Sequence, residues 1–121
     1  MNSISITIPI PPRILSPNAR PHWAKKAKAT KAFRLRSWAA SSAATKGTPE
    51  RWLKAKLEVV AYFPTRRFPD PTNLMASLKA AEDGICDAGV VANDRGLWPE
   101  RPVFKVDKVY PRIELTITEE L

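Results

Sequence analysis

Hydrophobic and polar residues alternate near both ends of the chain. Every second position from residue 4 to residue 10 is isoleucine, and the two prolines that follow end this pattern. Near the other end, apolar residues occupy every second position from Ile113 to Ile117, with Glu or Thr between them. A period of two residues is typical of a strand with one buried face. We therefore predict strands over residues 4–10 and 112–118.

The same alternation predicts two further strands. The longest begins at Leu53 and ends at Phe63, where apolar residues alternate with lysine and glutamate until Pro64 follows. A shorter one is predicted from Val103 to Tyr110. Proline lacks the N–H group that a strand ladder needs, so Pro64 ends the longest strand. Pro111 is expected to mark a bend or a tight turn between the last two strands.

A long helix is predicted from Trp23 to about Ala44. This segment consists mainly of Ala, Lys, Arg and Ser and contains no Gly or Pro, which favours a helix. Helical spacing gives an expected inner face formed by Ala24, Ala27, Leu35 and Trp38. Lys31 falls on the same stripe, so the amphipathic pattern is imperfect. Gly, Thr and Pro at residues 47–49 end the helix.

A second helix follows the longest strand. Leu74, Leu78, Ala81 and Ile85 recur at helical spacing, and Gly89 is a natural stop. The expected element order is therefore strand, helix, strand, helix, strand, strand. This order predicts a single α+β domain over residues 1–121, with two layers: a small mixed or mostly antiparallel sheet covered by two main helices.

Composition agrees with one globular domain. The chain has 121 residues, of which 44% are hydrophobic and 26% charged, and no apolar run approaches the ~20 residues needed to cross a bilayer. Its first residues lack the basic leader of a secretory signal. Cys86 is the one cysteine, which excludes an internal disulfide, and no Cys or His near it in sequence suggests zinc. We expect a cytosolic protein with a buried thiol and no membrane partner.

The net charge of +8 is unevenly distributed along the chain. Residues 1–49 contain nine Lys or Arg and no Asp or Glu, whereas residues 50–121 contain eleven basic and twelve acidic residues. Such one-sided positive charge suits a polyanion, because neutralised phosphates release their counterions. The alternative is a solvated basic helix face that keeps the protein soluble.

The segment from residue 66 to residue 96 holds the candidate chemistry. Asp70, Thr72 and Asn73 lie where a strand gives way to a helix, and such residues commonly cap free backbone N–H groups. Capping alone does not explain the adjacent pair Arg66 and Arg67, which precedes Asp70 by three residues, or Lys79 two turns into the helix. Together with a helix start, the arginines favour a phosphate-binding surface.

The second predicted helix carries a lysine and several acidic residues. Lys79, Asp83 and Asp87 share a face at i, i+4 and i+8, which also fits a solvated salt-bridge ladder, above all for Asp87. Glu82 is expected at the surface. Asp94 lies in the following loop and can return toward Asp70. Convergent carboxylates with open coordination positions suit Mg²⁺, which prefers oxygen ligands.

Other candidate residues give weaker signals. His22 is the one histidine, and its position beside Trp23 in a basic loop favours packing or phosphate contact over general-base catalysis. The four tryptophans can stack on bases, although at least two are expected in the core. No nucleophile elbow, Walker loop, dinucleotide fingerprint or zinc spacing is present.

The central segment resembles the RusA family of Holliday-junction resolvases, small endodeoxyribonucleases common in phages and prophages. The matching features, in chain order, are Arg66-Arg67, Asp70, Asn73, Lys79-Ala80, Asp83-Gly84, Ala88-Gly89 and Asn93-Asp94. The strand ending in Pro11-Pro12, the loop through Ser16, Asn18 and Arg20, and His22-Trp23 before a basic helix also look like family features. The resemblance covers most of the chain.

The resemblance implies a homodimeric, Mg²⁺-dependent enzyme, with Mn²⁺ as a substitute ion, that nicks opposing strands of a four-way DNA junction in recombination and repair. By similarity, Asp70, Lys79 and Asp94 are the expected catalytic residues, and Asp70, Asp83 and Asp94 the expected metal ligands. Lys79 is expected to contact the scissile phosphate. The residues expected to contact DNA are Asn18, Arg20, His22, Lys25, Lys28, Arg66, Arg67 and Asn73.

Three positions depart from the family pattern. Thr72 and Asn93 stand where many members carry acidic residues, and Lys79 lies three residues farther along the helix than in the best-known members. Neutral oxygens bind Mg²⁺ more weakly than carboxylates. Two alternatives therefore stay open: a DNA-binding protein that has lost its metal chemistry, and a basic accessory protein whose acidic residues only cap and solvate helices.

Overall fold

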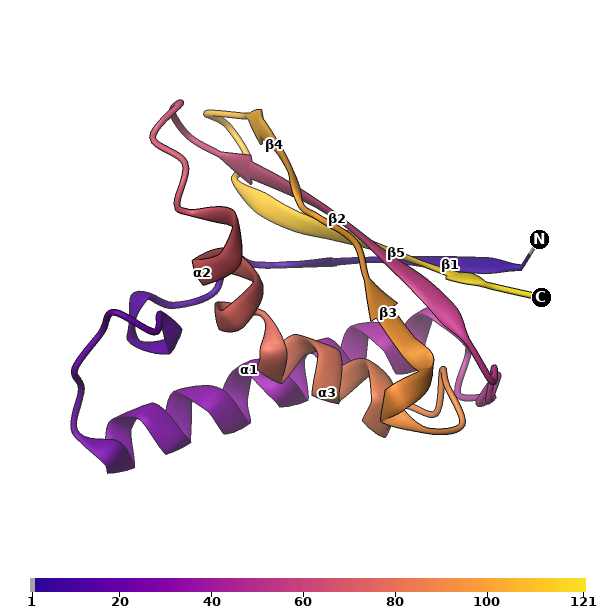
Figure 1. Cartoon of the computed structure of the whole chain (residues 1–121). Helices are drawn as coiled ribbons and strands as arrows, with labels where there is room; N and C mark the ends of the chain where they lie inside the picture. Colours follow the sequence, from indigo (N-terminus) through magenta and orange to yellow (C-terminus); the bar gives the residue numbers. More distant parts are fainter. Residues whose placement is uncertain (1) are drawn as a thin grey trace.

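A computed structural model describes residues 2–121 of the chain. It contains five strands, three α-helices and two short 3-10 helices (Figure 1). In chain order these are β1 (Ser3–Ile8), η1 (Arg13–Leu15), α1 (Trp23–Ala44), β2 (Ala55–Phe63), α2 (Pro71–Ser77), α3 (Lys79–Asp87), η2 (Asp94–Gly96), β3 (Leu97–Pro99), β4 (Val103–Val106) and β5 (Arg112–Glu119).

The strands form one mixed sheet in the order β1-β5-β2-β3, with β4 also paired to β2. β5 is antiparallel to both β1 and β2, whereas β3 and β4 run parallel to β2. The helices lie on one side of this sheet (Figure 1). The predicted fold class, a two-layer α+β domain with a small mixed sheet, is thereby confirmed. No helix within residues 2–121 is long and apolar enough to cross a membrane.

The hydrophobic core lies between the sheet and the helices. Alternate residues of β2 from Ala55 to Ala61 are buried, as are the apolar positions of β5, while Lys56 and Glu58 point to the other face. Ile6 of β1 pairs with Leu115 of β5, so both predicted terminal strands contribute to one core. Period-two sequence patterns therefore identified the inward faces correctly.

The predicted bounds of the first helix are confirmed, but its predicted inner face is wrong. Ala24, Ala27, Leu35 and Trp38 are all exposed, the last two by 61% and 42%, and the buried residues are instead Phe33, Ser37 and Ser41. The reason lies in α3, which packs so closely that only small residues fit between the two helices. A side chain at Gly84 would come within 2.8 Å of the Ser37 Cβ and the Trp38 backbone nitrogen.

The second predicted helix is divided into α2 and α3 at Leu78. The Leu78 N–H donates to the carbonyl oxygens of Leu74 and Met75 at 3.0 and 3.1 Å, a tightened turn that redirects the chain. All four predicted apolar positions are nevertheless buried. The one cysteine, Cys86, is half-buried in α3, so the thiol is only partly enclosed.

The remaining strand predictions need smaller corrections. The longest strand begins at Ala55, and Leu53 is 85% exposed because the chain bends after Trp52, whose side chain is buried instead. β3 was not predicted, since it has only three residues. The strand predicted from Val103 ends at Val106, because the Asp107 carboxylate accepts hydrogen bonds from the next backbone N–H groups and forms a turn.

Candidate functional site

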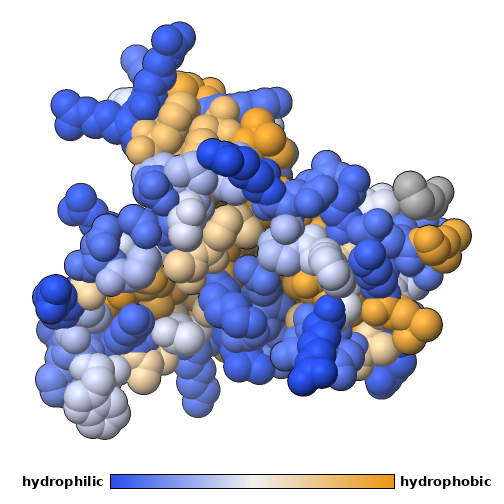
Figure 2. Space-filling model, in the orientation of Figure 1, coloured by the Kyte–Doolittle hydropathy of each residue, from blue (hydrophilic) through white to orange (hydrophobic). Residues whose placement is uncertain are grey.

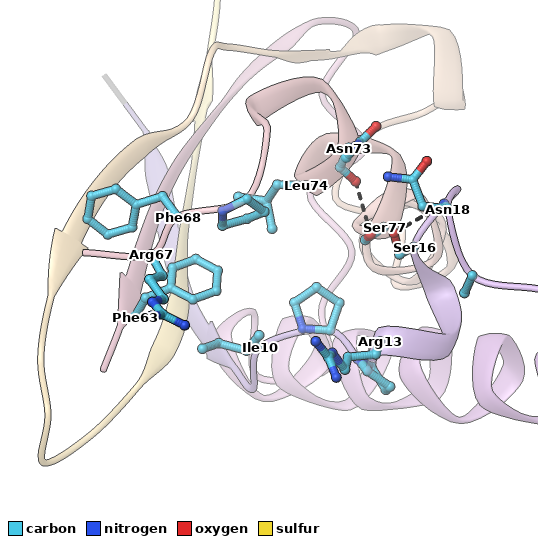
Figure 3. Close-up of a pocket in the computed structure, with 14 residues that line it drawn as sticks. Ile10, Arg13, Ser16, Asn18, Phe63, Arg67, Phe68, Asn73, Leu74 and Ser77 are labelled. Atoms are coloured by element: carbon cyan, nitrogen blue, oxygen red, sulfur yellow. Dashed lines mark hydrogen bonds between the residues drawn. The ribbon is translucent and has the colours of Figure 1, made fainter. Parts of the chain in front are cut away.

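A cleft of about 740 Å³ lies between the loop that follows β1 and the segment that joins β2 to α2 (Figure 3). It brings together three of the predicted DNA contacts, Asn18, Arg67 and Asn73, from positions far apart in the sequence. The other lining residues are Ile10, Pro11, Pro12, Arg13, Ser16, Ala19, Phe63, Phe68, Pro69, Leu74 and Ser77. Arg13 was not among the predicted DNA contacts, because nothing in the sequence brought η1 next to α2.

The cleft carries positive charge without compensating negative charge. No carboxylate lines it, and neither Arg13 nor Arg67 forms an ion pair with any residue from 2 to 121. Both side chains are exposed at its rim. Unpaired guanidinium groups are good ligands for phosphate, since their N–H groups match its oxygens in a two-point contact.

An acidic depression of about 410 Å³ lies against α2 as well. Its charged lining residues are Asp70, Glu82, Glu100 and Arg101, and Thr72 and Met75 also border it. The two cavities share no lining residue, yet both are bordered by α2. The basic cleft is bordered by Asn73, Leu74 and Ser77, and the acidic depression by Asp70, Pro71, Thr72 and Met75.

Asp70 caps the first turn of α2. Its Oδ1 accepts hydrogen bonds from the backbone N–H groups of Thr72 and Asn73 at 2.9 and 3.2 Å. The capping interpretation of Asp70 is therefore confirmed. The Oδ2 atom has no hydrogen-bond partner among residues 2–121, so the same carboxylate can still bind a cation from the acidic depression.

Glu82 is the acidic residue that sequence reasoning missed. It was expected at the surface, but it is half-buried in α3 and faces the same depression as Asp70. Burial raises the pKa of its carboxyl group, the positive charge of Lys79 acts in the opposite direction, and the negative charge of Asp83 adds to the rise. Its position four residues after the buried Leu78 was the available signal, because such residues lie on one helix face.

Lys79, Asp83 and Asp87 form ion pairs, one within α3 and two between α3 and Arg34 of α1. Lys79 Nζ lies 2.9 Å from Asp83 Oδ1, and Arg34 donates two hydrogen bonds to Asp87, of 2.6 and 2.8 Å. The salt-bridge interpretation of Asp87 is confirmed, and the hydrogen bond from Arg34 lowers the pKa of its carboxyl group. Asp83 is also 4.0 Å from the Arg34 side chain. Both its carboxylate oxygens thus face cations.

Lys79 and Asp70 line different depressions. Lys79 and Asp83 border a hollow of about 250 Å³ together with Lys26 and Thr30 of α1. The hydrogen bond to Asp83 raises the pKa of Lys79, which therefore stays charged in this position.

Asp94 and Asn93 lie at the start of η2. The Asn93 side-chain oxygen accepts a hydrogen bond of 3.0 Å from the Arg95 backbone N–H, so it acts as a cap. Asp94 is exposed, and its charge helps to raise the pKa of Cys86 to about 11, an effect due mainly to burial of the thiol. Within residues 2–121 no three Asp, Glu, His or Cys side chains are grouped closely enough to hold a metal ion, so Asp70, Asp83 and Asp94 are not gathered into one site.

The residues that border the acidic depression nevertheless suit one kind of ion. Mg²⁺ usually takes one or two protein carboxylates and completes its shell with water and substrate phosphate. Asp70 and Glu82 provide two carboxylates on one open surface, which fits this requirement. Ions that need four protein ligands do not fit.

The remaining predicted DNA contacts lie on exposed surfaces. Arg20, His22, Lys25, Lys28 and Arg66 are all exposed. His22 has a further structural role, since its Nδ1 accepts a hydrogen bond of 3.2 Å from the Ala24 backbone N–H and caps α1. Among the tryptophans, Trp52 is in the core, whereas Trp23, Trp38 and Trp98 are exposed.

Comparison with known proteins gives a relative but no family. No protein-family model matches the chain. An uncharacterized protein of Xylella fastidiosa (strain Temecula1 / ATCC 700964) is 37% identical over 92 residues, which cover 69% of this chain and 56% of the relative. The chain thus spans little more than half the length of that relative.

Proposed function

We propose that this protein is a Mg²⁺-dependent endodeoxyribonuclease that resolves four-way DNA junctions by paired nicking, in recombination and repair. It acts as a homodimer in the bacterial cytoplasm, and the junction is its substrate. The proposal combines the resemblance of residues 66–94 to the RusA family with the arrangement of charges around α2.

One observation carries the proposal. The seven-residue helix α2 borders both a cleft with two unpaired arginines and a depression with the carboxylates of Asp70 and Glu82. A helix of this length spans only about 10 Å. A DNA strand whose phosphates bind Arg13 and Arg67 would therefore pass close to the two carboxylates, which is the arrangement that metal-assisted phosphodiester hydrolysis requires.

Each part of this surface has a distinct role. Arg13 and Arg67 hold the backbone, and the cations of α1, including Lys25 and Lys28, extend the contact along the strands. Asp70 and Glu82 would hold Mg²⁺, which when bound polarises the phosphate and lowers the pKa of a bound water.

Lys79 and Asp94 are placed in the mechanism by resemblance. In the free protein Lys79 is paired with Asp83, so a scissile phosphate would have to replace that carboxylate as its partner. Asp94 and Asp83 would join the metal site only through movement of their segments toward Asp70. A dimer suits the substrate, because a junction offers paired scissile phosphates to a two-fold enzyme.

The test is cleavage of a synthetic four-way junction with Mg²⁺, with Mn²⁺ as a second ion. We expect paired nicks from the wild type and no product from Asp70→Asn, Glu82→Gln or Asp94→Asn. Asn caps a helix nearly as well as Asp, so Asp70→Asn leaves α2 intact. Glu50→Gln, a change at an exposed residue that borders neither cavity, is the matched control and should cut normally. Undiminished cleavage by both aspartate variants would exclude this function.

The second candidate function is junction binding without cleavage. Two observations favour it. The side chains of Thr72 and Asn93 carry no charge, and both carboxylate oxygens of Asp83 are paired with cations, so all three are poor ligands for Mg²⁺. This alternative predicts salt-sensitive junction binding with no metal-dependent product. If neither junction binding nor a Mg²⁺-dependent thermal shift is observed, a purely structural role for the acidic residues is the remaining explanation.

A further inference from the structure

The basic cleft has a flat apolar end that a phosphate backbone does not need. Phe63 and Phe68 line this end, and Leu74 and Ile10 continue the apolar lining (Figure 3). Phe68 stacks on Phe104 of β4, with ring centroids 5.0 Å apart, and meets Phe63 edge-on at 6.1 Å. The ring is thus held from two sides while 37% of the residue stays exposed.

The surface around this aromatic group is apolar as well. Figure 2 shows apolar residues gathered at the upper end of the molecule, where β4 lies, between long hydrophilic side chains. Val103 and Val106 of β4 are exposed by 51% and 44%. Fixed aromatic rings beside cations are what proteins use to stack bases of single-stranded nucleic acid.

The other end of the cleft presents two free amides. Asn18 and Asn73 lie near each other there (Figure 3), and neither side-chain amide has a hydrogen-bond partner among residues 2–121. Their backbones are nevertheless fixed. The Asn18 N–H donates to Ser16 Oγ at 3.3 Å, and the Asn73 carbonyl accepts from Ser77 Oγ at 2.9 Å. An amide offers both donors and acceptors, so it can match the edge of a base.

We propose that this cleft binds one unpaired nucleotide of a DNA strand. The base lies against Phe68, its hydrogen-bonding edge meets Asn18 and Asn73, and its phosphate binds Arg13 or Arg67. The lack of any carboxylate in the lining and the two unpaired arginines favour an anionic ligand. The aromatic end and the amides suit a flat ring with polar edges, and a nucleotide combines both properties.

This inference deepens the proposed function and rests on it for the choice of DNA as the ligand. A base within a duplex is paired and stacked on both sides, so it cannot enter the cleft without the cost of unstacking. Strand exchange points and bulges offer an unpaired base at lower cost. The cleft would therefore favour branched or interrupted DNA over a continuous duplex, independently of any hydrolysis.

The test compares three labelled DNA duplexes in EDTA, where no metal-dependent cleavage occurs. One is fully paired, one carries a single bulged nucleotide, and one carries an abasic bulge at the same place. Stacking of one base is worth about 1–3 kcal/mol, so anisotropy should show at least about five-fold tighter binding to the base-bearing bulge than to the abasic one. Equal affinity of the wild type for both bulges overturns the proposal.

Variants locate the effect in the cleft. Phe68→Ala should remove most of the preference for the base-bearing bulge, whereas Trp98→Ala, which removes another exposed aromatic residue on β3, should leave it unchanged. If Phe68→Ala does not fold, Asn18→Leu on the exposed loop gives the same comparison. An unchanged preference in the folded cleft variant contradicts the inference.

The outcome is separable from that of the cleavage assay. Asp70→Asn should keep the bulge preference, since Asp70 does not line the cleft. A protein that shows the preference but cuts no junction would refute only the nuclease. A protein that cuts junctions but shows no preference would refute only the nucleotide cleft.

Discussion

Arg34 of α1 and Asp87 of α3 form a two-point ion pair, in which Nε and Nη2 of the arginine donate to the two carboxylate oxygens at 2.6 and 2.8 Å. The two residues lie 53 positions apart in the sequence, so the pair joins separate helices. It lies at the edge of their contact, where the side chains remain partly exposed. The ion pair joins α1 to α3, the helix that also carries Glu82.

The ion pair predicts that folding stability depends weakly on pH in the acidic range. The folded-state pKa of Asp87 is lowered from 3.8, so its contribution is present above pH 3.8 and is lost as the pH falls through the folded-state value. Asp87→Asn should therefore lower the urea midpoint slightly at pH 7, and by a smaller amount near pH 2, where more of the Asp87 carboxyl group is protonated. Circular dichroism at both pH values checks this. A larger loss at the lower pH would contradict it.

The close contact at Gly84 predicts a much larger loss of stability than the loss of the Arg34–Asp87 ion pair. A methyl group added there would meet the Ser37 Cβ and the Trp38 backbone nitrogen at 2.8 Å, and also the Arg34 carbonyl oxygen, so the helices must separate. Gly84→Ala should destabilise the fold by about 1–3 kcal/mol despite the better helix propensity of alanine. Urea unfolding measures this. Ala39→Leu, on the exposed face of α1, is the control, and equal stability of Gly84→Ala and the wild type would show that the contact is loose.

The burial of Glu82 predicts that replacement of this residue makes the protein more stable, whereas the replacements of Asp87 and Gly84 make it less stable. Its folded-state pKa is raised above 4.5, so the charged carboxylate costs stability at pH 7, and this cost disappears as the pH falls below 4.5. Glu82→Gln should be more stable than the wild type at pH 7 and equal to it near pH 3.

Magnesium supplies a second readout of the same residue. If Glu82 holds the ion, Mg²⁺ should raise the melting temperature of the wild type and not that of Glu82→Gln. An equal Mg²⁺ shift in both proteins would place the ion elsewhere. Glu114→Gln, on the opposite face of the sheet, controls for loss of one negative charge.

The unpaired arginines predict how DNA binding responds to salt. Replacement of Arg13 or Arg67 by Gln should weaken binding to all DNA forms and lower the slope of log affinity against log salt by about 1 for each lost phosphate contact. Titrations at several salt concentrations measure that slope. Lys108→Gln, an exposed change in the turn before β5, should leave it unaltered, and a similar loss there would indicate only general charge attraction.

Local patterns were sufficient for much of the fold. Alternation identified the buried faces of β1, β2 and β5, because the period of two is a property of the strand itself. The absence of Gly and Pro set the bounds of α1. Its buried face could not be found in this way, since the burial of Ser37 and Ser41 depends on the close approach of Gly84 from another helix.

The candidate site was only partly accessible to sequence reasoning for the same reason. Asp70 was identified because a helix start has a local signature. Arg13 and Glu82 were missed, since their roles arise from how η1, α2 and α3 meet in three dimensions. The ion pair of Lys79 with Asp83 was foreseen as one of two alternatives, and only tertiary placement relative to Arg34 favours it over a shared metal site.

The position of β5 between β1 and β2 has a consequence for biosynthesis. β1 and β2 do not pair with each other. On the side that faces β5, each of them forms its backbone hydrogen bonds with β5. A nascent chain therefore cannot close this sheet until residues 112–119 have left the ribosome, so β1 has no partner strand until that segment has been synthesised.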